Sequence, residues 1–166
     1  MPTFSVTQSL STNPPELFAF LADARNMARW NSGVAEVDGE QASPAREGAR
    51  YRYRFPGRHR FHELECSAYR APSLIGFRGQ RMWTPLGIQS VGYTFRVRPG
   101  EGDGAGGRGE GSTLQVTVDV RLYGAMLLLV PIVALGWRRD LPEDMERLRA
   151  MLEPAVAERD HEPLTW

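Results

Sequence analysis

The chain has 166 residues, of which 42% are hydrophobic and 24% charged, and these values are typical of one globular domain. Its formal net charge is zero, which argues against nucleic-acid binding, because phosphates are neutralised by an excess of basic residues. All twenty basic residues are arginine, which excludes Schiff-base catalysis through lysine. The single cysteine, Cys66, excludes an internal disulfide, and the first ten residues do not resemble a secretion signal, so we expect a cytoplasmic protein.

The N-terminal part predicts one strand followed by two short helices. Residues 3–10 alternate between apolar and polar side chains, which is typical of a half-buried strand. Asn13 and Glu16 have the spacing of a capping box around two prolines, and this predicts a helix over 14–22. A second short helix is expected over about 24–30.

The middle of the chain predicts a series of hairpins. The expected strands cover 34–41, 49–56, 59–70, 74–83, 88–98 and 113–123. The last strand alternates so regularly that the sheet should be covered on one face only. The glycine-rich stretch 99–111 is interpreted as a hairpin tip, because a phosphate-binding loop would lead into a helix.

The C-terminal part predicts a long amphipathic helix. Asp140 and Glu143 have capping-box spacing, which indicates a start at Asp140 and places Asp144 with them in the first turn. An apolar stripe follows, formed by Leu141, Met145, Leu148, Leu152 and Val156. The uncharged stretch 122–137 is too short and too interrupted to span a membrane. Whether 126–139 forms a helix, a gate loop or a membrane-contacting segment stays open.

This order of elements, with the sequences of residues 11–31, 63–79, 112–124 and 141–153, resembles the SRPBCC superfamily (the START or helix-grip fold). Within it, the chain is most similar to the bacterial polyketide cyclase/dehydrase-like branch. The resemblance implies an α+β fold in which a long C-terminal helix crosses the concave face of a seven-stranded, curved antiparallel sheet, with two short helices after the first strand. It also implies a cavity between sheet and helix. We expect one such domain over 1–159 and a tail over 160–166.

Strand parity suggests which side chains face that cavity. Tyr51, Tyr53 and Phe55 alternate with arginines, which should face water, so the aromatic rings should point inward. We expect the cavity to be lined by aromatic, aliphatic and a few polar side chains, namely Trp30, Tyr51, Tyr53, Phe55, His62, Leu64, Phe77, Trp83, Tyr93, Phe95, Val118, Met126, Met145 and Leu148. The alternative for each of them is plain core packing.

No catalytic constellation emerges from the sequence, and His62, Tyr53 and Tyr93 are only weak candidates. His62 and Cys66 would lie about 13 Å apart along one strand, too far for an ion pair. The three histidines do not cluster, so we expect no metal, and nothing indicates a cofactor.

Three functions remain open. The first is binding or carriage of a hydrophobic small molecule, lipid-like or polyketide-like, in an internal cavity. The second is a polyketide cyclase, aromatase or dehydratase that acts through cavity shape and one or two polar residues. The third is a peripheral membrane or partner-binding module that uses residues 124–137. For all three we expect a monomer or homodimer without nucleic acid.

Overall fold

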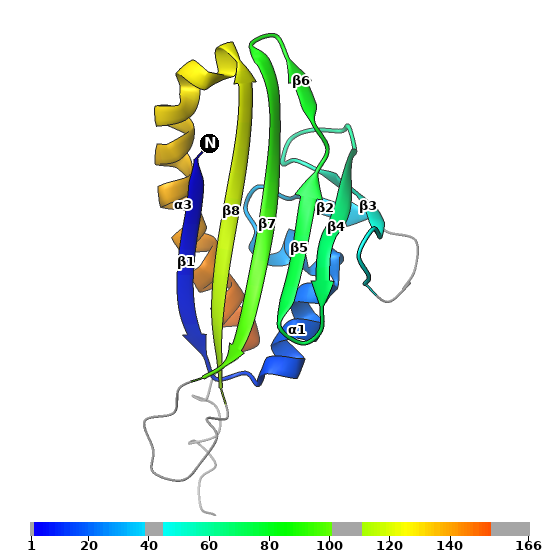
Figure 1. The fold of residues 1–166 in the computed structure, drawn as a ribbon, viewed down its shortest axis with the longest axis vertical. Helices are drawn as coiled ribbons and strands as arrows, with labels where there is room; N and C mark the ends of the chain where they lie inside the picture. Colours follow the sequence, from blue (N-terminus) through cyan, green and yellow to red (C-terminus); the bar gives the residue numbers. More distant parts are fainter. Residues whose placement is uncertain (1, 39–44, 101–110, 154–166) are drawn as a thin grey trace, which may run out of the picture.

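The sheet dominates the computed structural model, which describes residues 2–38, 45–100 and 111–153 (Figure 1). Its strands are β1 (Thr3–Leu10), β2 (Glu36–Asp38), β3 (Arg50–Arg54), β4 (His62–Arg70), β5 (Leu74–Gly79), β6 (Met82–Thr84), β7 (Gly87–Pro99) and β8 (Ser112–Gly124). Among these residues the sheet has eight strands in the order β1-β8-β7-β5-β4-β3-β2, with β6 paired to β7. Every pairing is antiparallel.

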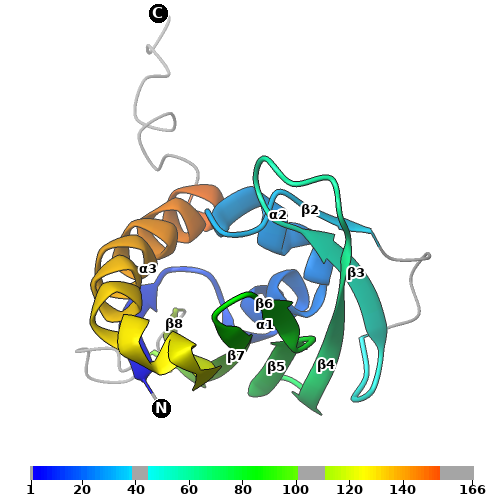
Figure 2. The same ribbon diagram turned by 90° about the horizontal axis from the view of Figure 1, so that it is seen from above.

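The helices lie on the concave side of this curved sheet (Figure 2). They are α1 (Pro14–Ala22), the 3₁₀ turn η1 (Ala24–Asn26), α2 (Met27–Trp30), the 3₁₀ turn η2 (Ala125–Leu129) and α3 (Val130–Leu152). The chain therefore has the predicted α+β, helix-grip architecture. No helix in the described ranges combines the length and the apolar character that a membrane crossing requires.

The predicted start of α1 is confirmed in detail. The Asn13 side chain accepts a hydrogen bond from the Glu16 backbone N–H at 3.0 Å. In return, the Asn13 amide donates to the Glu16 carboxylate at 3.1 Å, so the cap is reciprocal. The helix ends at Asp23, whose carboxylate accepts the Arg25 N–H and starts η1.

The strand predicted over 74–83 is divided in two. At Gln80 the backbone N–H still bonds to Glu63, but the chain then turns, and β6 pairs with the early part of β7. The break moves the alternation by one residue, so Met82 is buried and Trp83 points out with 82% of its surface exposed. The prediction that Trp83 lines the cavity was wrong for this reason.

The long helix begins earlier than predicted. It starts at Val130 with Pro131 in its first turn, and it continues through Asp140 and Pro142, which lies inside the helix. Residues 126–139 are therefore helical, and Asp144 lies in the middle of α3 rather than in its first turn. Leu141, Met145 and Leu148 are buried as predicted. Val156, the tail over 160–166 and most of the glycine-rich loop are outside the described residues.

The concave face is mostly filled by side chains. The largest side chains that are fully buried come from β5, β7, β8 and the helices, and include Phe77, Phe95, Leu114, Val116, Val118, Met145 and Leu148. On the convex face, arginines of β3 reach acidic residues, as Arg54 does with Glu36 at 2.7 Å and Arg50 with Glu63 at 3.7 Å. Glu63 thus faces solvent beside arginines.

Candidate functional site

A small cavity of about 70 Å³ remains between the concave face of the sheet, the turn after α2, and α3. It is lined mainly by carbon, through Met27, Gly33, Val34, Tyr53, Phe55, Leu64, Gly79, Val91, Tyr93 and Trp137. Ligand pockets for drug-sized molecules usually measure about 300–1,000 Å³. The cavity therefore has room for a chemical group, and a larger guest needs a side chain to move.

Two phenol groups supply most of the polarity of this cavity. Burial raises the pKa of Tyr53 to about 12, and burial is the sole cause of this rise. Burial also raises the pKa of Tyr93, although a hydrogen bond from the Asn31 side chain opposes the rise. Both phenols are neutral near pH 7, so each can donate a hydrogen bond to an acceptor in the cavity.

The position of the Tyr53 hydroxyl depends on a glycine across the sheet. A Cβ added to Gly79 would lie 2.7 Å from the Tyr53 hydroxyl oxygen, which is closer than real contacts of this kind. Gly79 therefore provides the space in which the hydroxyl reaches the cavity wall. The ring of Tyr53 has little freedom to retreat, because it packs against Phe55 with centroids 5.2 Å apart.

We expect Gly79→Ala to lower the free energy of unfolding by about 1–3 kcal/mol through overpacking. The added Tyr53→Phe change removes the oxygen that clashes, so the double variant should recover most of the loss. Chemical denaturation of Gly79→Ala, Tyr53→Phe, the double variant and the wild type measures both effects. Equal destabilisation with and without the Tyr53 hydroxyl would show that the clash lies elsewhere.

A buried carboxylate fixes one wall of the cavity without lining it. Asp144 on α3 accepts hydrogen bonds from the Ser32 backbone N–H at 3.0 Å and from the Ser32 hydroxyl at 3.1 Å. Burial raises the pKa of Asp144, while the bonds from Ser32 oppose the rise. Because Ser32 precedes Gly33 and Val34, Asp144 holds the turn that forms this part of the wall.

Trp137 separates the cavity from a larger open groove. The groove has a volume of about 360 Å³ and runs between β1 and α3, along Phe4, Val6, Trp137 and Leu141. The Trp137 ring packs against Phe4 on the groove side and against Tyr93 on the cavity side, with centroids 6.4 Å and 6.0 Å apart. Trp137 therefore lines both spaces.

The sequence-predicted cavity residues fall into four groups. Tyr53, Phe55, Leu64 and Tyr93 line the cavity. Seven others belong to the buried core that surrounds it, namely Trp30, Phe77, Phe95, Val118, Met126, Met145 and Leu148. Tyr51 is half-buried against Phe77.

The remaining two lie elsewhere. His62 does not line the cavity, since its ring packs against Phe55 and its Nδ1 lies 3.4 Å from the Gln80 amide nitrogen. Burial and the nearby Arg60 lower the pKa of His62. Trp83 is on the surface, as described above. Of the three weak catalytic candidates, the structure thus brings together Tyr53 and Tyr93 only.

Several lining residues were missed by the sequence interpretation. Val91 and Gly79 share a strand face with Tyr93 and Phe77, so parity could have found them. Met27, Gly33 and Val34 come from a short helix and a turn, where alternation gives no signal. The sequence did not predict Trp137 as a lining residue, because the start of α3 was placed at Asp140, after Trp137.

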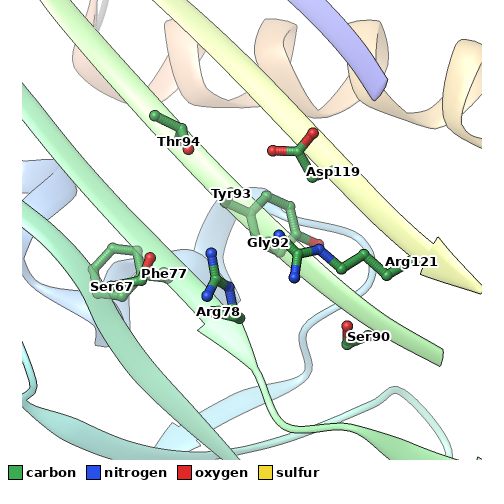
Figure 3. A pocket seen from close by; sticks show the side chains of 9 residues that line it. All are labelled: Ser67, Phe77, Arg78, Ser90, Gly92, Tyr93, Thr94, Asp119 and Arg121. Carbon is green, nitrogen blue, oxygen red and sulfur yellow. The ribbon is translucent and has the colours of Figure 1, made fainter. Parts of the chain in front are cut away.

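A second small pit lies on the opposite, convex face of the sheet (Figure 3). Gly92 forms part of its floor, with Arg78, Arg121, Asp119 and Ser90 around it. Its volume is about 30 Å³, which suits one or two water molecules. The sheet itself separates this polar pit from the apolar cavity, so the two cannot hold one ligand.

A curved antiparallel sheet around a long C-terminal helix, with a small apolar cavity between them, defines the chain as a helix-grip protein. A family model described as "Polyketide cyclase / dehydrase and lipid transport" matches residues 1–153. The chain belongs to this family, as its resemblance to the SRPBCC superfamily predicted. No curated protein matches the sequence.

Solved structures show the same fold at low sequence identity. A conserved protein from Geobacillus kaustophilus has a TM-score of 0.65 and 9% identity, over 91% of this chain and 95% of its own. The protein Mll3558 from Rhizobium loti has a TM-score of 0.62 and 20% identity, over 91% and 96%. The di-domain ARO/CYC protein BexL of the BE-7585A biosynthetic pathway has a TM-score of 0.65 and 14% identity, over 90% of this chain and 45% of its own.

Proposed function

We propose that this protein binds a hydrophobic small molecule whose polar end is a hydrogen-bond acceptor such as a carbonyl group. The observation that carries the proposal is the pair of neutral phenols, Tyr53 and Tyr93, on a cavity otherwise lined mainly by carbon. An unoccupied donor in such a place stabilises a ligand that brings the matching acceptor. The family, which includes lipid transport in its description, is consistent with an apolar guest.

The apolar body of the ligand would extend past Trp137 into the groove between β1 and α3. The cavity, at about 70 Å³, is too small for a fused ring, whereas the groove has about 360 Å³. Phe4, Val6 and Leu141 give that groove an apolar lining. In this arrangement the acceptor meets Tyr53 and Tyr93, and Trp137 packs beside the ligand rather than between the two spaces.

A matched pair of ligands tests the proposal. 2-Acetylnaphthalene and 2-ethylnaphthalene have nearly the same shape, but only the first has a carbonyl oxygen. We expect wild-type protein to bind the acetyl compound with about 2–10-fold higher affinity, which corresponds to the net contribution of one hydrogen bond. Tyr53→Phe or Tyr93→Phe should reduce that preference, as measured by isothermal titration calorimetry.

Two further variants make the outcome decisive. Tyr51→Phe removes a phenol from the same face of β3 but outside the cavity lining, so it should keep the preference. Trp137→Ala should tighten binding of both compounds, because it joins the cavity and the groove. The proposal fails if neither compound binds wild type or Trp137→Ala, or if the preference survives in both cavity variants.

A cyclase or dehydratase is the second candidate, and the same two phenols favour it. Two donors on one carbonyl oxygen would stabilise the enolate that forms when a neighbouring C–H bond is broken. Against it, the ionisable groups among the described lining residues are those two neutral phenols, so the cavity wall offers no general base. Proton exchange of the acetyl methyl group in D₂O, followed by NMR, separates the candidates, since a simple binder leaves the exchange rate unchanged.

A further inference from the structure

Exposed apolar side chains gather at one end of the molecule. We use the name "apolar end" for the large hydrophobic residues that are exposed in the described part of the chain, namely Trp83, Leu86, Tyr123, Leu127, Leu128, Ile132 and Leu135. Trp83 and Leu128 are the most open, with 82% and 81% of their surfaces exposed. Scattered exposed apolar residues are ordinary, but a collection at one place indicates an interaction surface.

Two segments far apart in sequence build this end together. One is the β6–β7 turn and the other runs from the end of β8 through η2 into α3, and both lie at the top of Figure 1. The Met126 N–H donates to the Leu86 carbonyl at 2.9 Å, which ties the turn to η2. Gly87 permits this approach, since a Cβ there would lie 2.0 Å from the Tyr123 carbonyl oxygen. The surface is therefore one fixed structure.

The charged residues in the two segments that form the apolar end are all arginines. Residues 81–95 and 120–139 contain no aspartate or glutamate. Their charged residues are Arg81, Arg121, Arg138 and Arg139, all of them exposed. Arg139 is paired with Glu143 at 3.8 Å, so Arg81, Arg121 and Arg138 form the rim. The guanidinium of Arg81 lies over the ring of Tyr123, with its Cζ 5.9 Å from the ring centroid. An apolar centre with an arginine rim has the chemistry that recognises an anionic lipid surface.

A second copy of the chain fits this surface poorly. A two-fold contact would place the same patch on both sides and bring the arginine rims together. Like charges facing each other weaken such a contact. A bilayer with anionic headgroups instead satisfies the arginines, while the exposed tryptophan of β6, next to the β6–β7 turn, is placed as interfacial tryptophans are.

We propose that the apolar end docks the protein on anionic lipid membranes, with Trp83 and Leu128 inserted and the arginines at the headgroups. This inference goes beyond the ligand role and does not depend on it. It extends the surface role predicted for residues 124–137 by adding the β6–β7 turn. The ring of Trp83, which the sequence placed in the cavity, thereby has a role at the surface.

Vesicle flotation tests the proposal with vesicles of phosphatidylcholine alone and of phosphatidylcholine mixed with phosphatidylglycerol. Wild type should float with the anionic vesicles, less so at high salt, and weakly with the neutral ones. Leu128→Asp should reduce partitioning at least about tenfold. Ala150→Asp introduces the same charge at an exposed position near the far end of α3 and should behave as wild type.

An arginine pair gives an independent control. Arg81→Gln should weaken binding to anionic vesicles about fivefold, whereas Arg96→Gln, on β7 away from the apolar end, should have little effect. Wild type that stays unbound, or Leu128→Asp that floats as well as wild type, overturns the proposal. A concentration-dependent dimer that Leu128→Asp abolishes would also overturn it, in favour of a protein interface. Binding of 2-acetylnaphthalene should be the same in Leu128→Asp and wild type, so failure of the ligand proposal remains distinguishable.

Discussion

Phe95→Ala is expected to lower the free energy of unfolding by about 3–5 kcal/mol. The Phe95 side chain is fully buried in the middle of β7, where its ring contacts Trp30 from α2 and Phe77 from β5. Its removal leaves a void between sheet and helices that neither rigid strands nor α2 can close. For a chain of this length, a midpoint of thermal unfolding about 6–20 °C lower should follow.

Trp83→Ala is the matched control, because it truncates a larger aromatic ring that lies on the surface. Its effect on stability should stay within about 0.5 kcal/mol. Thermal and urea unfolding, followed by circular dichroism, compare the two variants directly. If Trp83→Ala proved as damaging as Phe95→Ala, Trp83 would not be exposed and the assignment of the apolar end to the surface would be wrong.

Strand alternation predicted the sheet well, because side chains on a strand have only two directions to take. Tyr53, Tyr93 and Phe95 are buried as that rule required, and the arginines opposite Tyr53 form surface ion pairs. The rule failed at Trp83, where a break at Gln80 moved the alternation by one residue. Nothing in the local sequence marks this break, since Gln80 acts through its bond to Glu63 on another strand.

The C-terminal helix shows a different limit. Asp140 and Glu143 have the spacing of a helix start. In the structure these residues lie within a longer helix, because the apolar faces of the preceding turns pack against β1 and η2. Tertiary packing therefore overrode a local capping signal. Because of this error, Trp137 was not predicted to lie on the helix, and Asp144 was placed in the first turn.

The candidate site could be predicted only in part. Inward phenols follow from alternation, but the size of the cavity depends on how completely the neighbouring side chains fill the concave face. The sequence also contained a neglected signal at Asp144. It lies three residues after Leu141 and four before Leu148, on the apolar stripe of the helix, where a carboxylate must find partners.

Those partners are the basis of the second large effect, which is expected for Asp144→Ala. The change removes the acceptor of the Ser32 backbone N–H and the Ser32 hydroxyl, and it also removes the partner of Arg147. Donors left unpaired near a buried position should lower the free energy of unfolding by about 3 kcal/mol. Chemical denaturation at neutral pH gives this value, and the turn at Gly33 should lose protection in hydrogen exchange.

Asp144→Asn separates loss of hydrogen bonds from loss of charge. Its amide oxygen can still accept from Ser32, so its stability at neutral pH should lie within about 1 kcal/mol of wild type.

The pH dependence of stability has a definite sign, since burial raises the pKa of Asp144 above its value in the unfolded chain. Between those two pKa values the folded state binds more protons, so wild type loses stability as the pH rises through that window. Asp144→Asn should lack this contribution, and urea unfolding across the acidic range measures the difference. A wild-type stability that instead increases more steeply with pH than that of Asp144→Asn would mean that the Ser32 and Arg147 contacts outweigh burial, and that the carboxylate is a net stabilising ion at this turn.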